Sequence, residues 1–103
     1  MFRRDMSVNV GVCKVKLRLP ENLSLKGKRS VIKSIITQVK NKFGISAAEI
    51  DDQNAWQIST IGFSCISNNS QHTNEVLSKV VNFVDNGHFD IEMLDYEIEI
   101  LTV

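Results

Sequence analysis

Four basic residues crowd the start of one predicted helix, namely Lys26, Lys28, Arg29 and Lys33. The helix macrodipole disfavours positive charge at this end, by roughly 0.3 to 1 kcal/mol per group at low ionic strength. None of the four has a carboxylate three or four residues away that could offset this within the helix. Free backbone N–H groups surrounded by cations form a physically sound anion site, and phosphate is the commonest such anion. The arrangement therefore predicts anion or RNA binding at the helix start.

A solvated helix face is the main alternative interpretation of these cations. In that case they lie in water or pair with Glu75 or Asp85 of a second predicted helix. The i, i+3, i+7 spacing of Lys26, Arg29 and Lys33 instead favours a stripe able to follow a nucleic-acid backbone. The sequence leaves both interpretations open.

Charge is strongly segregated along the 103 residues, although the formal net charge is zero. Residues 14–42 hold nine cations against the single acid Glu21, whereas residues 43–103 hold ten carboxylates against Lys79. Such segregation favours a polyanion or an acidic partner for one surface. The sequence contains no complete catalytic motif, and nothing in it calls for a cofactor, so a non-enzymatic role is favoured.

A second polar stretch contains Asp51, Asp52, Gln53 and Trp56. Two adjacent aspartates without further ligands are more typical of a hairpin turn than of a divalent-cation site, because their short side chains bond local backbone. We interpret Trp56, which opens the next predicted strand, as a core or interface anchor rather than a stacking platform.

Hydrophobic periodicity predicts six elements in the order βαββαβ. Alternating residues predict strands over 8–19, 45–50, 56–66 and 90–103, and apolar stripes predict helices over 24–43 and from about 69 to 86. This order folds most simply as an α+β ferredoxin-like sandwich, with an antiparallel sheet ordered 4-1-3-2 and both helices on one face. Lys14, Lys16 and Arg18 would then face Glu97 and Glu99 across the open side of the sheet, which explains them structurally.

Length and composition indicate one ferredoxin-like domain over 8–103, preceded by an N-terminal extension over 1–7. The sequence has no apolar run of the roughly 20 residues that span a bilayer, and its start does not resemble a signal peptide. We therefore expect a cytoplasmic protein. Cys13 and Cys65 lie in strand-like apolar segments, and small buried hydrophobes are the favoured interpretation.

Four motifs in this order resemble the YlxP-like family of small bacterial proteins. They are Val10-Gly11-Val12-Cys13 leading into Leu17-Arg18-Leu19-Pro20, Ser24-Leu25-Lys26-Gly27-Lys28-Arg29-Ser30, Glu49-Ile50-Asp51-Asp52-Gln53-Asn54-Ala55-Trp56-Gln57, and Leu94-Asp95-Tyr96-Glu97-Ile98-Glu99. The resemblance implies a ferredoxin-like fold. It also implies that residues 1–6 exceed the usual start, so either Met6 initiates the chain or these residues form a tail.

The YlxP-like family has no established activity. Its members are commonly encoded near translation-initiation and ribosome-maturation genes, which implies by association a role with ribosomal RNA or ribosome assembly factors. The resemblance would place Lys26, Lys28 and Arg29 in one functional stretch. It would place Asp51, Asp52, Gln53 and Trp56 in a second one.

The sequence thus supports two functions of different classes. The first is an RNA-associated accessory protein that uses helix and loop cations, because the strands lack the aromatic pair with which RNA-recognition motifs stack bases. The second is a homodimeric protein-interaction or regulatory module, which would bury the open sheet face near Val10, Val12 and Ile58. A small enzyme is the third and weakest possibility.

Overall fold

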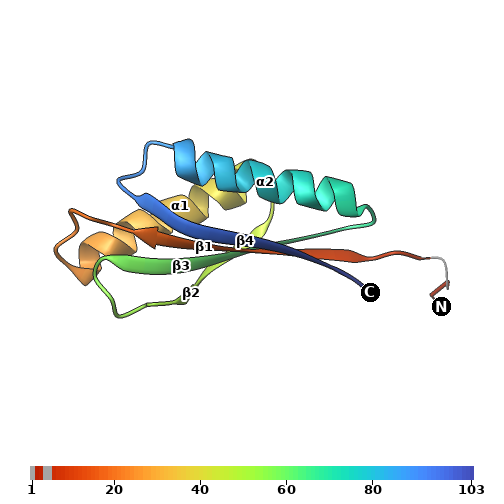
Figure 1. Cartoon of the computed structure of the whole chain (residues 1–103), viewed down its shortest axis with the longest axis horizontal. Coiled ribbons are helices and arrows are strands. Elements are labelled where there is room, and N and C mark those ends of the chain that lie inside the picture. The colour runs from red at the N-terminus through yellow and green to blue at the C-terminus, as the bar shows by residue number, and fades with distance from the viewer. Residues whose placement is uncertain (1, 4–5) are drawn as a thin grey trace.

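The order of helices and strands follows the sequence prediction. In the computed structural model, which describes residues 2–3 and 6–103, the elements are β1 (Asn9–Arg18), α1 (Leu25–Phe43), β2 (Ser46–Asp51), β3 (Ile58–Ser67), α2 (Ser70–Asn86) and β4 (Glu92–Thr102). Three positions of the predicted N-terminal extension, residues 1, 4 and 5, lie outside the described part of the chain. Figure 1 shows both helices on one side of the strands.

The sheet has the strand order β2-β3-β1-β4, and the described neighbours are all antiparallel. Read from the other edge this is 4-1-3-2, so the predicted ferredoxin-like fold is confirmed. The strand β1 occupies the interior of the sheet, and its residues alternate as predicted. Cys13, Val15 and Leu17 are buried beneath the helices, whereas the intervening basic side chains are exposed on the open sheet face. We use "open sheet face" for the side of the sheet away from the helices.

The two helices begin and end at residues suited to these positions. The Ser24 hydroxyl accepts a 3.0 Å hydrogen bond from the backbone N–H of Gly27 and caps α1, and the Asn69 side chain caps α2 through the N–H of His72. Gly44 ends α1 in the left-handed region, at φ 65°, which glycine adopts without a steric penalty.

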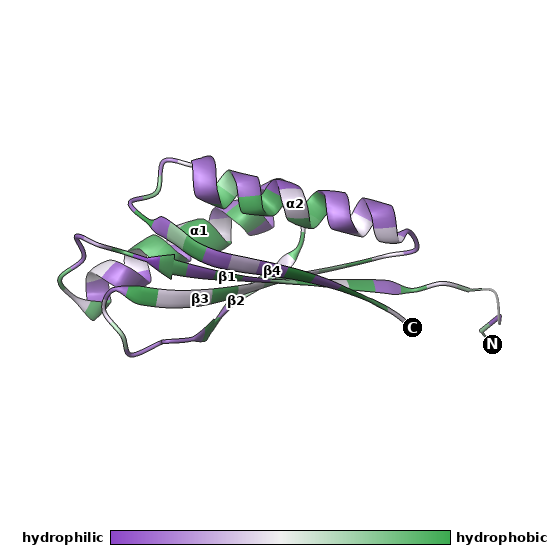
Figure 2. Cartoon of the chain, viewed as in Figure 1, coloured by the Kyte–Doolittle hydropathy of each residue, from purple (hydrophilic) through white to green (hydrophobic). Residues whose placement is uncertain are grey.

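Each helix buries one apolar stripe against the sheet. The stripe of α1 includes Ile32, Ile35 and Val39, and that of α2 includes Leu77, Val80, Val81 and Val84. In Figure 2 the outer side of α2 is mostly purple, as expected for a helix with one solvated face. No helix in the described part of the chain is long and apolar enough to cross a membrane.

A β-bulge in β4 changes the pairing predicted for the strand cations. Lys16 lies opposite Asp95 but Leu17 lies opposite Met93, so Leu94 is the extra residue. Lys14 pairs with Glu97, as predicted, with 3.9 Å between Nζ and Oε2.

Arg18 does not lie opposite Glu97 or Glu99 as predicted, because the antiparallel register places both towards the other end of β1. The bulge brings Glu92 opposite Arg18 instead. The guanidinium of Arg18 lies 2.9 Å from Glu92, whereas Glu99 lies opposite Val12. The bulge also shifts the alternation of β4, because Met93 and not Leu94 lies opposite the helix-facing Leu17. Ion pairs thus explain Lys14 and Arg18 structurally, whereas Lys16 lies opposite Asp95 without an ion pair among the described residues.

Burial of Cys13 predicts a loss of stability at high pH. Its side chain is fully buried, and desolvation of the thiolate raises the pKa of Cys13 from 9.0 to about 11. The folded state keeps the proton to a higher pH than the unfolded state. The full stability is therefore present below pH 9, and up to about 3 kcal/mol is lost as the pH rises towards 11.

Urea unfolding of the wild type and of Cys13→Ala between pH 8 and pH 11 measures this loss. Other groups also titrate in this range, so the difference between the two proteins is the informative quantity. We expect the variant to lose less stability than the wild type over this interval. Parallel pH profiles would contradict the prediction.

Candidate functional site

The two polar stretches singled out in the sequence are joined through the loop before α1. The side chain of Asn22, in the loop before α1, donates hydrogen bonds of 2.6 Å to the carbonyls of both Ser24 and Trp56. In return, the Gln57 side chain donates to the Asn22 carbonyl at 3.1 Å. The backbone N–H of Leu19 donates to the Gln57 carbonyl at 2.8 Å. The β2–β3 loop is thus tied to the start of α1.

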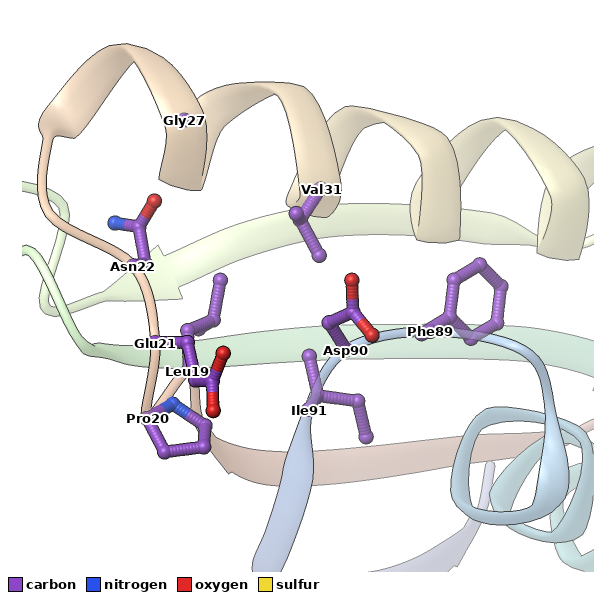
Figure 3. A pocket seen from close by; sticks show the side chains of 9 residues that line it. All are labelled: Leu19, Pro20, Glu21, Asn22, Gly27, Val31, Phe89, Asp90 and Ile91. Carbon is purple, nitrogen blue, oxygen red and sulfur yellow. The ribbon is translucent and has the colours of Figure 1, made fainter.

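Gly27 makes room for this connection. A Cβ atom at residue 27 would lie 2.4 Å from Oδ1 of Asn22, a distance that requires Asn22 to move. Figure 3 shows Asn22 beneath the first turn of α1, on the side where Gly27 lies. This contact explains why a residue of poor helix propensity occupies the first turn of α1.

Lys28 does not lie on the surface, so the prediction that it binds an anion there is wrong. The residue is 0% exposed, and its Nζ lies 3.1 Å from Oε2 of Glu49 in β2. The same ammonium group donates a hydrogen bond to the carbonyl of Asp52, and Glu49 Oε2 also accepts a 2.6 Å hydrogen bond from the hydroxyl of Ser59. Lys28 is therefore an internal cation that holds α1 against β2 and the loop that follows it.

The other three predicted cations, Lys26, Arg29 and Lys33, are exposed on α1. Among the described residues no carboxylate lies within ion-pair distance of any of them, so the alternative pairing with Glu75 or Asp85 is not formed. The sequence of α1 contains no acidic residue at all. Three of the four predicted anion-binding residues thus remain available to an external partner.

Lys40 extends the same helix face and was missed in the sequence analysis. It is exposed, and it follows Lys33 by the same seven-residue step that separates Lys33 from Lys26. Seven residues are about two helical turns and about 10 Å of helix length, so the three lysines lie close to one line over roughly 21 Å. The repeated seven-residue spacing is the signal that could have found it. We call Lys26, Arg29, Lys33 and Lys40 the basic stripe.

Asp51, the last residue of β2, and Asp52, which follows it, serve the turn, as the sequence favoured. The backbone of Asp52 has φ 64°, a left-handed conformation that aspartate tolerates better than most residues. Its N–H donates to Asp51 Oδ1 at 2.8 Å, and its own Oδ2 accepts from the Thr60 hydroxyl at 3.0 Å. Gln53 follows as an exposed residue.

Trp56 is 56% exposed, so the prediction that it anchors the core is wrong. Two of the interpretations considered for it remain, an interface anchor and a stacking platform. Its backbone is fixed through its carbonyl, which accepts the hydrogen bond from Asn22. The exposed indole therefore belongs to a loop that is fastened to the start of α1.

A cavity of about 550 Å³ lies on another side of the α1 start (Figure 3). Its lining is Leu19, Pro20, Glu21, Asn22, Gly27, Val31, Phe89, Asp90 and Ile91. Among the described residues, the charged side chains that line it are the acids Glu21 and Asp90, which would repel a phosphate. An anion is therefore expected on the outer surface of α1 and not in this cavity.

The fold and this surface define a small ferredoxin-like α+β protein with a basic first helix. The chain belongs to the family described as "Protein of unknown function (DUF503)", whose sequence model matches residues 10–98. It is 42% identical over 62 residues to the uncharacterised protein YlxP of Bacillus subtilis strain 168, a match covering 60% of this chain and 67% of YlxP. The resemblance to the YlxP-like family is thereby confirmed.

Solved structures with similar folds are distant in sequence. The de novo designed protein Foldit4 has a TM-score of 0.48 at 12% identity, over 92% of this chain and 96% of its own. An amidase of the hydantoinase/carbamoylase family from Burkholderia phymatum has a TM-score of 0.49 at 8% identity, over 95% of this chain and 29% of the amidase. At this level of similarity neither structure bears on function.

Proposed function

We propose that this protein binds RNA through the basic stripe and acts as an RNA-associated accessory protein. The observation that carries the proposal is the contrast between two groups of cations. Lys14, Arg18 and Lys28 each have a carboxylate partner within the fold, whereas Lys26, Arg29 and Lys33 have none among the described residues. Cations that the fold leaves unpaired on one helix face are suited to an external polyanion.

The geometry of the basic stripe suits a phosphate backbone better than a single small anion. Its ends are separated by about 21 Å of helix length, a distance over which a nucleic-acid strand presents several phosphates. Arg29 and Lys33 are like charges one helical turn apart, an arrangement that disfavours the free helix. Binding a polyanion would relieve that repulsion.

Ribosomal RNA or a ribosome assembly factor is the partner we propose, in the cytoplasm. The proposal of this partner rests on the gene neighbourhood of the YlxP-like family, and the free thiols of Cys13 and Cys65 are compatible with a reducing compartment. Binding of the purified protein to ribosomal RNA and to ribosomal subunits, measured at several salt concentrations, tests it. Absence of binding at low salt would refute the proposal.

Self-association through the open sheet face is a second candidate function. This face exposes apolar side chains, with Ile66 70%, Leu101 48% and Ile50 47% exposed. It also carries a basic row on β1 beside an acidic row on β4, as the pairs Lys14–Glu97 and Arg18–Glu92 show. A two-fold axis parallel to the strands and between these rows would set each row against the opposite row of a second copy.

Analytical ultracentrifugation tests this second candidate. We expect a concentration-dependent dimer for the wild type and a monomer for Ile66→Asp, because a charge in the apolar part of a contact is costly to bury. The matched control is Leu23→Asp, which changes a residue that is 79% exposed but lies in the loop before α1. A wild type that remains monomeric at millimolar concentration would exclude this interface.

A further inference from the structure

Trp56 is a large apolar side chain held in an exposed position. The indole is 56% exposed although it belongs to a small domain with a well-formed core. Exposed aromatic side chains near cations are the means by which many proteins hold single-stranded nucleic acid, since bases stack on the ring while the cations contact phosphates. The surroundings of Trp56 decide whether it can serve in this way.

The loop that carries Trp56 is well fixed. The carbonyl of Trp56 accepts from Asn22 at 2.6 Å, the next residue bonds the chain before α1, and Ala55 N–H closes a turn onto the Asp52 carbonyl at 3.1 Å. The buried ammonium group of Lys28 bonds the same Asp52 carbonyl. The backbone of such a fixed loop loses little conformational freedom when a ligand binds, which favours affinity.

The same hydrogen bonds place the loop beside the start of α1. One amide group, Nδ2 of Asn22, donates to the carbonyls of both Trp56 and Ser24 at 2.6 Å, so these two carbonyls are neighbours. Ser24 is the cap of α1, and the stripe begins two residues later at Lys26. A nucleotide chain that reaches the start of α1 would therefore also pass near the loop that carries Trp56.

We propose that the RNA ligand is single-stranded at this site, with one base stacked on the indole of Trp56 and its neighbouring phosphates on Lys26 and Arg29. This inference rests on the proposed function, because it specifies the ligand of the same surface. The phosphates of duplex RNA could contact the cations, but its bases could not stack on the indole, since they are stacked on each other and their faces are covered. The site thus distinguishes unpaired RNA from duplex RNA by the use of one aromatic side chain.

The protein contains a single tryptophan, so its tryptophan emission, excited selectively over that of Tyr96, reports on Trp56 alone. The probes are a ten-nucleotide oligoadenylate, an RNA duplex of ten base pairs and inorganic polyphosphate. We expect the oligoadenylate to quench the emission, and the duplex and the polyphosphate to leave it nearly unchanged. Quenching of equal extent by polyphosphate would overturn the inference, because polyphosphate has no base to stack.

Variants of Trp56 separate stacking from charge. Trp56→Ala is expected to weaken binding of the oligoadenylate by about tenfold or more, and to leave polyphosphate binding unchanged. Trp56→Phe keeps an aromatic ring and should retain most of the affinity. Circular dichroism on both variants establishes that they are folded, and the exposure of the side chain favours this outcome.

The possible results separate the two proposals. Equal affinity of the wild type and Trp56→Ala for the oligoadenylate, with binding still dependent on the basic stripe, would overturn stacking and leave RNA binding standing. No binding of either RNA at low salt would overturn both. If the indole instead anchors a protein interface, the wild type and Trp56→Ala should bind the oligoadenylate equally well.

Discussion

Lys28→Met should lower the free energy of unfolding by about 3 to 5 kcal/mol, the usual effect of removing one partner from a buried ion pair. Methionine fills similar space, but it leaves the Glu49 carboxylate, whose side chain is only 18% exposed, without its cation. It also removes the donor to the Asp52 carbonyl. The size of the effect follows from leaving a charge uncompensated in a region of low dielectric, and not from lost packing.

This loss is a large share of the 5 to 15 kcal/mol by which a typical domain is stable. For a chain of this length, a melting temperature lower by on the order of 15 °C is expected. Urea and thermal unfolding measure both quantities. A loss below 1 kcal/mol would mean that the buried pair of Lys28 and Glu49 does not form.

Two further variants control for the substitution itself. Lys33→Met makes the same change at an exposed position of the same helix, and its effect should stay within about 0.5 kcal/mol. Adding Glu49→Gln to Lys28→Met removes the uncompensated charge while keeping an oxygen that can accept from Ser59. We expect the double variant to recover part of the lost stability.

Reversing three charges of the basic stripe is the change with the largest expected effect on binding. In Lys26→Glu/Arg29→Glu/Lys33→Glu, three phosphate contacts are lost. Each contact on a single strand contributes about 0.7 to the slope of log K against log salt, so in 0.1 M salt the loss of three lowers affinity about 100-fold. The stability of the fold should change little, because all three side chains are exposed without partners among the described residues.

Lys79→Glu is the matched control for charge reversal. It changes an exposed lysine of α2, which is separate from the basic stripe. Its effect on RNA affinity should be less than threefold. Filter binding or fluorescence anisotropy with a labelled ribosomal RNA fragment measures all the variants, and equal weakening by the control would contradict a role specific to α1.

Much of the fold is readable from local patterns in the sequence. The alternation along β1 places Cys13, Val15 and Leu17 in the core because strand side chains point to opposite faces in turn. Ser24 and Gly44 bound α1 because a hydroxyl can cap a helix and glycine can end one. The bulge at Leu94 has no comparable local signal, since it follows from how β4 pairs with β1.

The candidate site was only partly readable. The partner of Lys28 could not be predicted from spacing within α1, because Glu49 lies in β2. A signal was nevertheless present, because Lys28 lies four residues before Ile32 and seven before Ile35, in phase with the buried stripe. The exposure of Trp56 could not be predicted from its apolar side chain, since it is set by the loop that holds the residue.

The dependence of RNA affinity on salt tests the central claim most directly. For a single-stranded ribosomal RNA fragment, we predict that log K of the wild type falls against log salt with a slope of about −2 to −3, corresponding to three or four phosphate contacts. The slope of the triple charge-reversal variant should be shallower by about 2, because three phosphate contacts are lost. A wild-type affinity that is indifferent to salt, or the same slope in both proteins, would contradict binding through the basic stripe.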